Sequence, residues 1–598
     1  MMNFGYHEEG PPRSIGDLHL WRRIGTFCTP YRILLIFALF LSLLVTGATL
    51  SLPYLMQHGI DNYITNQLIS SEMRLTGLAR TAAWYGSFIA LLFLVSFCQI
   101  MTLEWIGQSI MHTIRQKLFL HLLQLDMAFF NTHATGRLVT RLTNDIQNMH
   151  EMFTSVIVTL FNDLLRLTCI LFLLFWINPE LAAIMTFFVP LSLLVTIFFA
   201  RLARERFRAI RTQLARLNSF LAESIAGISI LQLFGREESS KNTFAGLSEG
   251  YLQRTLRQIR LFGAFMPLTE FMSSTAVALI LWYGGGEIIK KQLTLGEFVA
   301  FLSYMRLFFQ PLRELSQKYS IVQSAMASAE RIFQLIDTEN QIIQPENSAR
   351  IEAFKGRLQF NNISFSYEKN TPLLDNISLT LPAGKTIALV GTTGSGKTTL
   401  VNLLLRFYDP REGSITIDGV DIKNLDLKEL RTIVGVIHQD VFILQDTLFA
   451  NIVLDTGCSR VTVEKILRQT GTDRFVHKLP KGLDTLIGDG GQELSTGEKQ
   501  LLAFMRVICR APKILILDEA TAAIDTESEN ILEKAVADSF KNRTSLIIAH
   551  RLSTIRRADQ IVVMSHGKIV EQGTHNQLLK EKGHYARLVA IDLKDDSR

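Results

Sequence analysis

Hydrophobic residues are concentrated in the first half of the chain, where they form long runs. A helix that crosses a bilayer needs about 20 apolar residues in succession. Six segments have this character: 33–56, 82–103, 156–177, 181–200, 262–283 and 298–315. The sixth is the weakest, because Arg306 and Glu314 interrupt it. Six such segments predict a bundle of membrane-spanning helices rather than the buried helices of a soluble protein.

The links between these segments predict the orientation of the bundle. The short turn 178–180 has no basic residue, whereas the long segment 201–260 is rich in Arg and Lys. Because Lys and Arg accumulate on the cytoplasmic side of membrane proteins, the long links and the N-terminal segment are expected in the cytoplasm. An even number of spans then returns the chain to the cytoplasm before the second half begins.

After about residue 340 the pattern changes to short apolar runs that alternate with helical patterns, as in an α/β domain with a largely parallel sheet. We therefore expect a multidomain fold, with an all-α transmembrane domain of six helices, extended into the cytoplasm, followed by an α/β P-loop ATPase domain. The expected boundaries are an N-terminal cytoplasmic or interfacial segment, a transmembrane domain, a linker and a nucleotide-binding domain: 1–32, 33–325, 326–355 and 356–598. The net charge of +6 is modest, and no basic–aromatic motif indicates a nucleic-acid partner.

Residues 391–399 read GTTGSGKTT and match the phosphate-binding pattern G-x-x-x-x-G-K-[ST]. An apolar run before this loop predicts a buried strand, and another after it predicts a helix whose N-terminus faces the anion. Lys397 is expected to reach the β- and γ-phosphates of a nucleotide, and the hydroxyl of Thr398 to bind Mg²⁺. The predicted ATP-binding residues of the loop are Gly391, Thr392, Thr393, Gly394, Ser395, Gly396, Lys397, Thr398 and Thr399.

Further candidate residues lie near the ends of apolar runs in the same half. Asp518 is placed to hold Mg²⁺ through water, and Glu519 to polarise an attacking water. His550 would contact the γ-phosphate, and Gln439 would sense Mg²⁺ and the attacking water. The ring of Tyr367 offers a surface on which adenine can stack. Each signal is weak alone, since an Asp-Glu pair is common on solvated loops and a histidine at a strand end is usually structural.

The segment 494–500, LSTGEKQ, is similar to the LSGGQ signature of the ABC transporter superfamily. The order of Tyr367, the phosphate-binding loop, Gln439, the signature, Asp518-Glu519, the D-loop and His550 matches that family. With six spans ahead of one ATPase domain, the chain resembles a half-transporter of the bacterial multidrug or lipid exporter type from about residue 15 to 590. Segments 129–145 and 222–237 resemble the two intracellular loops, each of which bears a short coupling helix in the family.

The resemblance implies how the site works. In the family two ATPase domains pair head to tail, and each ATP lies between the phosphate-binding loop of one and the signature of the other. Glu519 and His550 would be catalytic, and the signature and D-loop would add Ser495, Thr496, Gly497, Glu498 and Asp525 to the ATP-binding set. ATP favours the closed pair, which turns the membrane domains outward and exports a hydrophobic or amphipathic substrate, drug-like or lipid. A protein of this type lies in the bacterial cytoplasmic membrane, with its ATPase domain in the cytoplasm.

Three residues depart from the family pattern: Thr496 replaces a signature glycine, Glu498 replaces its glutamine, and Ala522 replaces a D-loop serine. Threonine adds a Cβ where glycine permits close approach of the backbone to phosphate, and Glu498 adds a negative charge near an anionic ligand. These departures favour a heterodimer with a second half-transporter, and a homodimer that tolerates the variant signature is the alternative.

Other functions remain open from the sequence, namely an ATP-gated channel, a non-transporting regulatory ATPase and an importer. The fused arrangement with six spans first disfavours the last two. Ionisable residues at membrane depth are costly and often line a pathway. Glu104, Glu270 and Arg306 are such candidates, and Asp163 and Arg166, one helical turn apart, are expected to pair with each other.

Overall fold

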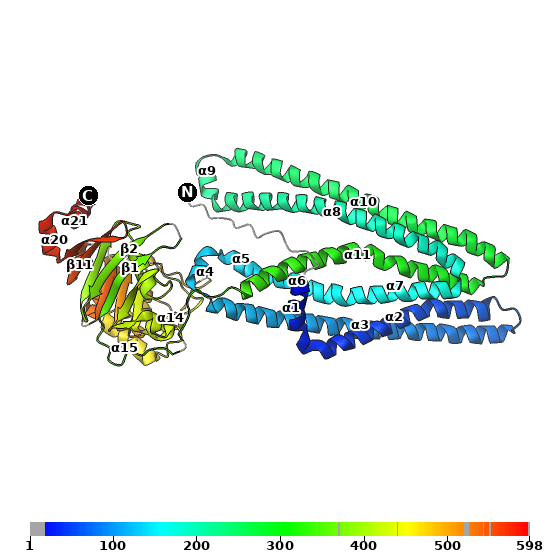
Figure 1. Cartoon of the computed structure of the whole chain (residues 1–598), viewed down its shortest axis with the longest axis horizontal. Helices are drawn as coiled ribbons and strands as arrows, with labels where there is room; N and C mark the ends of the chain where they lie inside the picture. Colours follow the sequence, from blue (N-terminus) through cyan, green and yellow to red (C-terminus); the bar gives the residue numbers. More distant parts are fainter. Residues whose placement is uncertain are drawn as a thin grey trace. The chain divides into compact units, whose positions relative to one another are not determined.

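The computed structural model describes residues 18–345, 347–368, 371–438, 440–488, 490–518, 526–541, 543–548 and 552–595. The chain divides into two compact units (Figure 1). The first, the helical unit, comprises the described residues of Met1–Gln124 and Ala134–Thr338. The second, the ATPase unit, comprises Leu125–His133 and the described residues of Glu339–Arg598.

Each of the six predicted apolar segments lies in a long helix of the helical unit. These helices are α2 (Arg32–Gly59), α3 (Ser71–Gln124), α7 (Val158–Ile177), α8 (Pro179–Ala226), α10 (Glu237–Ile289) and α11 (Leu295–Ile336). With 54 residues, α3 is about 80 Å long at 1.5 Å per residue. Because the hydrocarbon core of a bilayer is about 30 Å thick, α3 extends well beyond it. Long helical extensions of this kind were predicted from the lengths of the links.

Length and composition identify four helices in the described part of the chain that could cross a membrane. They are contained in Leu18–Ile64, Ser71–Gln124, Val158–Ile177 and Glu237–Ile289. In α8, only Pro179–Phe188 stands out as a shorter apolar helix. The predicted segment 181–200 in α8 has no charged residue, whereas Arg306 interrupts the apolar run of the segment 298–315 in α11.

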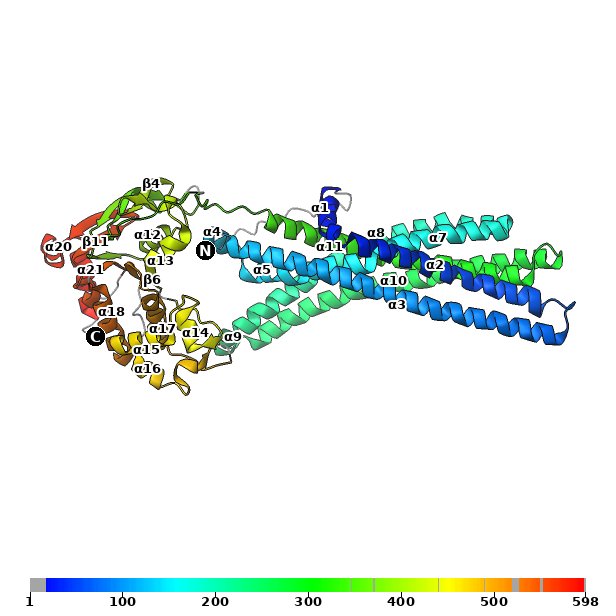
Figure 2. The same cartoon turned by 90° about the horizontal axis from the view of Figure 1, so that it is seen from below.

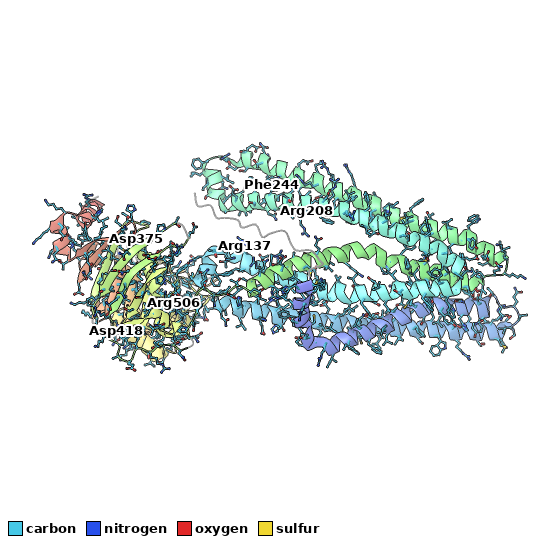
Figure 3. The ribbon with its side chains drawn as sticks, viewed as in Figure 1. Arg137, Arg208, Phe244, Asp375, Asp418 and Arg506 are labelled. Carbon is cyan, nitrogen blue, oxygen red and sulfur yellow. The ribbon has the colours of Figure 1, made fainter. Side chains whose placement is uncertain are left out.

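Shorter helices complete the helical unit and its connections. They are α1 (Leu18–Cys28), α4 (Met127–Thr132), α5 (Thr135–Thr140), α6 (Ile146–Met152), α9 (Ile228–Leu233), the 3₁₀ turn Thr29–Tyr31 and the π-turns Ile60–Ile64, Arg141–Asp145 and Phe153–Ile157. Figure 2 shows α8 and α10 side by side, with α9 at their turn. Arg208 lies on α8 and Phe244 on α10 in this basic, extended pair (Figure 3).

Local sequence explains where two of the long helices begin. Asn178 caps α8, since its side-chain oxygen accepts the backbone N–H groups of Glu180 and Leu181, both at 3.0 Å. Pro179 occupies the first helical position, where its missing N–H costs nothing. Thr294 caps α11 in a capping box with Glu297. The tight turn predicted at 178–180 is therefore a capped helix start.

The ATPase unit contains a six-stranded sheet in the order β12-β11-β3-β10-β9-β6. Its strands are β3 (Thr386–Gly391), β6 (Val434–Ile437), β9 (Ile514–Asp518), β10 (Thr544–Ile548), β11 (Gln560–Ser565) and β12 (Lys568–Gly573). All neighbours pair in parallel except β11 and β12. The inner strands are buried along their length, which explains their continuous apolar sequence. The α/β prediction is confirmed.

A second, antiparallel sheet has the order β2-β1-β4-β5. Its strands are β1 (Leu358–Phe365), β2 (Leu374–Leu381), β4 (Glu412–Ile417) and β5 (Val420–Asp421), and a small pair is formed by β7 (Asp446–Thr447) and β8 (Leu486–Ile487). Asp418, in the β4–β5 turn (Figure 3), accepts the N–H groups of Lys355, Gly356 and Arg357 at 2.8–2.9 Å. This turn fixes the segment that leads into β1.

The helices of the ATPase unit are α12 (Lys397–Leu404), α13 (Leu427–Ile433), α14 (Leu448–Val453), α15 (Arg460–Thr470), α16 (Asp473–His477), α17 (Thr496–Cys509), α18 (Thr526–Phe540), α19 (Leu552–Ile555), α20 (His575–Glu581) and α21 (His584–Asp595). One apolar core joins the two sheets and α12, and includes Phe360, Leu403 and Ile516. Another lies among α14, α15 and α17, and includes Ile452 and Phe504. These two cores hold the ends of the sheet and the start of α17 in fixed positions.

Candidate functional site

The phosphate-binding loop follows β3 directly, as the sequence predicts, and two of its glycines are required by close contacts. A Cβ added at Gly391 would lie 2.2 Å from the carbonyl oxygen of Met564 on β11. A Cβ at Gly396 would lie 2.4 Å from Leu374 Cδ2, and Gly396 has φ +101°. Side chains at either position would push the loop away from the sheet, so glycine is what lets the loop turn here.

Lys397 is the first residue of α12 and is buried. Its Nζ donates hydrogen bonds to the carbonyl oxygens of Gly391 at 2.7 Å and Thr392 at 3.2 Å, so the ammonium group is held inside the loop. The hydroxyl of Ser395 is buried, and it has no hydrogen-bond partner among the described residues. Thr398 is exposed. A buried cation, a buried hydroxyl and a helix N-terminus together fit a phosphate anion.

Sheet order explains how distant residues reach this loop. Strand β10 lies between β3 and β9, and Ile548 pairs with Leu389 on one side and with Asp518 on the other. Because β3, β10, β9 and β6 are parallel, their carboxyl ends share one edge, where ligands bind in open α/β sheets. Asp518, at the end of β9, is only 8% exposed at this edge. The structure thus brings the predicted Asp518 to the same edge as the phosphate-binding loop.

The other residues predicted at this edge are Gln439, Glu519, Asp525 and His550, and all four lie outside the described residues. The strands that precede three of them are described: β6 ends at Ile437, β9 at Asp518 and β10 at Ile548. The roles given to these four side chains therefore stay predictions.

Tyr367 is well placed to contact a base. It is 48% exposed, and its hydroxyl lies 3.3 Å from Thr399 Oγ1 and 3.3 Å from Asn402 Nδ2, both on α12. Its ring meets the rings of Phe365 and Tyr408 edge to face, each with centroids 5.0 Å apart. One ring is thereby held beside the phosphate-binding helix with much of its surface open to solvent. The sequence analysis missed Tyr408, because no local pattern brings residues 367 and 408 together.

The signature segment forms the start of α17. Ser495 is the N-cap residue, and its hydroxyl accepts the N–H of Glu498 at 3.3 Å. The Glu498 carboxylate in turn accepts the N–H of Ser495 at 2.8 Å, which completes a capping box. Thr496 is exposed as the first helical residue, and Gly497 is buried. Glu498 therefore has a structural task that glutamine performs equally well, beside the charge effect predicted for it.

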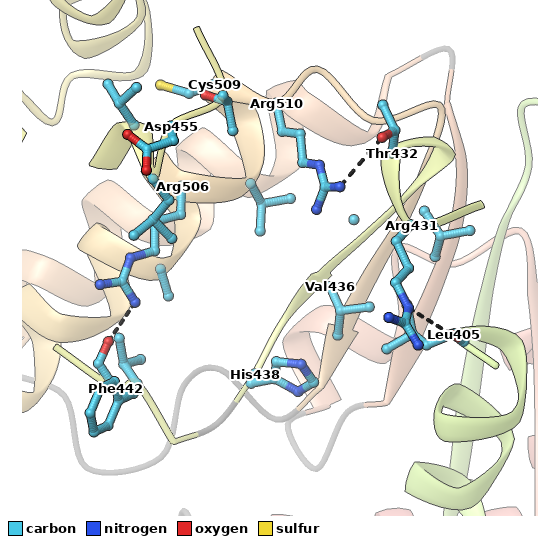
Figure 4. A pocket seen from close by; sticks show the side chains of 18 of the residues that line it. Leu405, Arg431, Thr432, Val436, His438, Phe442, Asp455, Arg506, Cys509 and Arg510 are labelled. Atoms are coloured by element: carbon cyan, nitrogen blue, oxygen red, sulfur yellow. Dashed lines mark hydrogen bonds between the residues drawn. The ribbon is translucent and has the colours of Figure 1, made fainter. Parts of the chain in front are cut away.

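A hollow of about 800 Å³ opens in the ATPase unit between the β6 region and the last turns of α17 (Figure 4). Arg506 is fixed there by hydrogen bonds to the carbonyl oxygens of Asn451 at 2.7 Å and Phe442 at 2.6 Å. Arg431, Arg510, His438 and Phe442 also line it. Burial lowers the pKa of Arg506, yet a guanidinium keeps its charge in proteins. The hollow is thus partly apolar and rimmed by cations.

The two segments that resemble intracellular loops both form short helices, α4 and α9. Asp126 caps α4 by accepting the N–H of Phe129 at 3.0 Å, and its other oxygen accepts the N–H of Gln341 at 2.7 Å. Asn131 of α4 donates a hydrogen bond to the hydroxyl of Tyr408 at 2.6 Å. Helix α4 is therefore part of the ATPase unit in its contacts, although it lies between helices of the helical unit in sequence.

Helix α9, in the second loop, has an exposed apolar surface in the helical unit. Ile230, Leu233 and Phe234 are 62%, 79% and 70% exposed. Three neighbouring exposed apolar side chains mark an interaction surface.

Two of the ionisable residues predicted near membrane depth, Asp163 and Glu104, have partners on other helices. Asp163 of α7 forms an ion pair with Lys318 of α11, whereas the sequence analysis expected it to pair with Arg166. Glu104 lies 3.2 Å from Nε2 of His150, which is buried. Glu270 and Arg306 are exposed in the helical unit. Pairing across helices could not be read from positions one turn apart on a single helix.

Comparison with known proteins agrees with both halves of this structure. A family described as "ABC transporter transmembrane region" matches residues 35–312, and one described as "ABC transporter" matches residues 374–522. The chain is 36% identical over 575 residues to the uncharacterized ABC transporter ATP-binding protein YknV of Bacillus subtilis, covering 95% of this chain and 94% of YknV.

Two further similarities concern a lipid transporter and a solved structure. The chain is 34% identical to an ATP-dependent lipid A-core flippase of Syntrophus aciditrophicus, covering 93% of this chain and 91% of the flippase. It is also similar to a bacterial Atm1-family ABC exporter with ATP bound, with a TM-score of 0.79 and 27% identity. That similarity covers 94% of this chain and 98% of the exporter.

Proposed function

We propose that this chain, which belongs to the ABC transporter family, is one half of a dimeric exporter in the bacterial cytoplasmic membrane. It is a multi-pass membrane protein whose ATPase domain binds and hydrolyses ATP to drive export. The substrate we propose is a hydrophobic or amphipathic molecule, either drug-like or lipid. The observation that carries the proposal is the shared edge of the parallel sheet, where the phosphate-binding loop and Asp518 meet.

Within this edge, each residue has a distinct proposed task. Lys397 and the backbone N–H groups of the loop bind the phosphates, and Tyr367 stacks on the adenine. Thr398, Gln439 and Asp518 hold Mg²⁺, the last through water; their hydroxyl, amide and carboxylate oxygens are the ligand types that Mg²⁺ prefers. When bound, Mg²⁺ neutralises charge that develops on the phosphate oxygens. The residues of this set bind and orient the nucleotide through their positions and charges.

Two further residues carry the proposed hydrolytic step. Glu519 orients a water molecule and accepts its proton as the water attacks the γ-phosphate. His550 donates a hydrogen bond to a γ-phosphate oxygen and so helps to hold the transferring group in line. Each follows a strand, β9 or β10, that ends at the shared edge.

A second half-transporter completes the assembly. In the proposed dimer the N-terminus of α17, with Ser495, Thr496, Gly497 and Glu498, faces the ATP held by the partner, and Asp525 contributes from the D-loop. ATP then contacts both ATPase domains only when they are closed, so it favours the closed and outward-facing state. Hydrolysis removes those contacts and returns the membrane domains to the inward-facing state.

The hollow in the ATPase unit supports the same arrangement. It offers apolar surface from Val436 and Phe442 inside a cationic rim. An apolar helix end such as Leu233 and Phe234 of α9 has matching chemistry. We propose that the α9 of one half-transporter contacts the hollow of the other, so that movements in the ATPase domains reach the membrane helices.

We further propose that the partner is a different half-transporter. Thr496 is branched where the family has glycine, and Ala522 lacks the hydroxyl that the family D-loop usually provides. Lys397, Glu519 and His550 would work with an intact signature of the partner. The variant signature of this chain would face a degenerate site that binds ATP and hydrolyses it slowly. A homodimer that tolerates Thr496 and Glu498 is the alternative.

The substrate class is supported by the surface of the helical unit and by the relatives. Large apolar side chains such as Phe93, Trp176 and Trp282 are 74–80% exposed, as expected where helices meet lipid. Relatives include the lipid A-core flippase, a Mycobacterium tuberculosis protein named as a fatty acid ABC transporter and a Bacillus subtilis protein named as a probable multidrug resistance transporter. All three names concern hydrophobic or amphipathic molecules or drugs.

Transport into inside-out membrane vesicles tests the proposal. Vesicles from cells that produce the chain with its native partner should accumulate a lipophilic dye or flip a fluorescent phospholipid only when ATP is added. Lys397→Ala should abolish this transport, whereas Glu412→Gln, a change of an exposed carboxylate on β4, should not. A steady ion current that ATP opens, without dye or lipid movement, would instead indicate a channel.

A further inference from the structure

A line of three side chains connects the proposed adenine surface with helix α4, entirely within the ATPase unit. The ring of Tyr367 meets the ring of Tyr408 edge to face, with centroids 5.0 Å apart and an angle of 85° between the planes. The hydroxyl of Tyr408 then accepts a hydrogen bond from Asn131 Nδ2 at 2.6 Å. The base-stacking residue is thus one side chain away from α4.

Both ends of this line are held by further contacts. At the nucleotide end, the Tyr367 hydroxyl lies 3.3 Å from Thr399 Oγ1, two residues after the phosphate-binding Lys397. At the other end, Asp126 caps α4 and accepts the N–H of Gln341 at 2.7 Å. A shift of the Tyr367 ring therefore acts on an ordered, capped helix rather than on a loose loop.

Tyr408 itself has a restricted environment. It follows Arg406, a buried residue with φ +50° whose Nε donates a hydrogen bond to Asp409 at 3.0 Å. Burial raises the pKa of Tyr408, so its hydroxyl stays protonated at physiological pH. The neutral phenol can accept the Asn131 N–H and keep its own proton. Tyr408 thus contacts the ring of Tyr367 on one side and the side chain of Asn131 on the other.

We propose that Tyr408 is a positioning residue that couples nucleotide binding at Tyr367 to the position of α4 through Asn131. This inference rests on the proposed function, since it assumes that a nucleotide base stacks on Tyr367. Stacking fixes the Tyr367 ring, and the edge contact then fixes Tyr408, whose hydroxyl favours one position of Asn131. Helix α4 begins three residues after α3 ends, so its position is passed along the chain to a membrane-spanning helix.

Thermodynamic linkage between nucleotide binding and the position of α4 predicts a change in nucleotide affinity that a purely structural contact would not cause. If binding of a nucleotide favours one position of α4, then weakening the hold on α4 must change the affinity for the nucleotide by the same free energy. Two side chains, Tyr408 and Tyr367, separate Asn131 from the base. An effect of Asn131 on nucleotide affinity would therefore report coupling through Tyr408.

The test uses the full chain in lipid nanodiscs, with its partner if the two co-purify, titrated with fluorescent N-methylanthraniloyl-ATP and displaced by ATP. Asn131→Ala and Tyr408→Phe should each weaken ATP binding by about threefold to tenfold, the range of one net hydrogen bond. The double variant should bind no more weakly than either single variant, because both remove the same contact. Melting temperature is measured in parallel to show that each variant is folded.

Thr132→Val is the matched control. Thr132 neighbours Asn131, but among the described residues its hydroxyl bonds only to Ala128, Phe129 and His133 of the same segment, so its loss should leave ATP affinity unchanged. The coupling is overturned if Asn131→Ala and Tyr408→Phe bind ATP as wild type does, or if their separate effects multiply in the double variant. Failure of the wild type to bind ATP, with Lys397→Ala indistinguishable from it, would instead overturn the proposed function.

Discussion

Asp145 is the residue whose replacement we expect to affect stability most clearly in the helical unit. Its side chain is 6% exposed and pairs with Arg331 of α11, whose Nε donates to Asp145 Oδ2 at 3.0 Å. Ser328 of α11 donates a further hydrogen bond to Oδ1 at 2.8 Å. Asp145 thereby ties the first intracellular loop to the last long helix with two partners.

Asp145→Asn keeps the size of the side chain but removes the carboxylate charge that pairs with the guanidinium of Arg331. Removing one partner of a fully buried ion pair costs about 3–5 kcal/mol. Because Arg331 is 31% exposed and retains some hydration, we expect a smaller loss of about 2–3 kcal/mol in the free energy of unfolding. The amide oxygen of the introduced asparagine can still accept the hydrogen bond from Ser328. We therefore expect a loss of stability near the lower end of that range.

Thermal unfolding of the purified full chain measures this loss. The matched control is Glu238→Gln, which breaks a pair with Lys241 in which both side chains are 73% exposed. That control should change stability by less than about 1 kcal/mol, as exposed pairs do. Adding Arg331→Met to Asp145→Asn should recover part of the loss, since it removes the cation that the Asp145 carboxylate had balanced. If Asp145→Asn melts no lower than Glu238→Gln, the reasoning about this buried pair is wrong.

Three further changes test separate parts of the structure. Gly391→Ala should abolish binding of fluorescent ATP, because its Cβ would lie 2.2 Å from the backbone carbonyl oxygen of Met564, whereas Gly394→Ala, whose Cβ meets nothing within 4 Å, should retain more binding. Glu498→Gln should raise ATP hydrolysis without lowering the melting temperature, since glutamine also completes the capping box; a large drop in melting temperature would contradict this. Burial lowers the pKa of His575 below its ordinary value of 6.5, so the unfolded chain binds the proton more readily. The melting temperature should therefore fall as the pH drops below 6.5, and should fall less in His575→Gln.

The phosphate-binding loop and its flanking elements could be predicted from the sequence because their signals are local. A buried apolar run, glycines at fixed spacing and a helix start specify β3, Gly396 and Lys397 within a few residues of one another. The order of the motifs along the chain predicted the ATPase fold. Because parallel strands place their carboxyl ends at one edge, motifs that follow such strands are expected to lie together there. The same local logic found the capped turn at Asn178 that begins α8.

Contacts between residues far apart in the sequence could not be predicted in this way. Asp163 pairs with Lys318 rather than with the residue one turn away, because its partner lies on a helix that only the tertiary fold brings near. Tyr408 and Asn131 meet across 277 positions of the chain. That the segment in α11 is the weakest of the six stays a prediction from its sequence, in which Arg306 and Glu314 interrupt the apolar run.

The measurement that tests the central claim most directly is purification of this chain from its native membrane, followed by identification of what accompanies it and assay of ATP hydrolysis with and without Glu519→Gln. We predict an equal amount of a second half-transporter that lacks a catalytic glutamate, and loss of hydrolysis in Glu519→Gln. Recovery of this chain alone with full ATP hydrolysis would contradict the heterodimer and show that Thr496 and Glu498 are tolerated in a homodimer. Hydrolysis that persists in Glu519→Gln would contradict the catalytic role given to that residue.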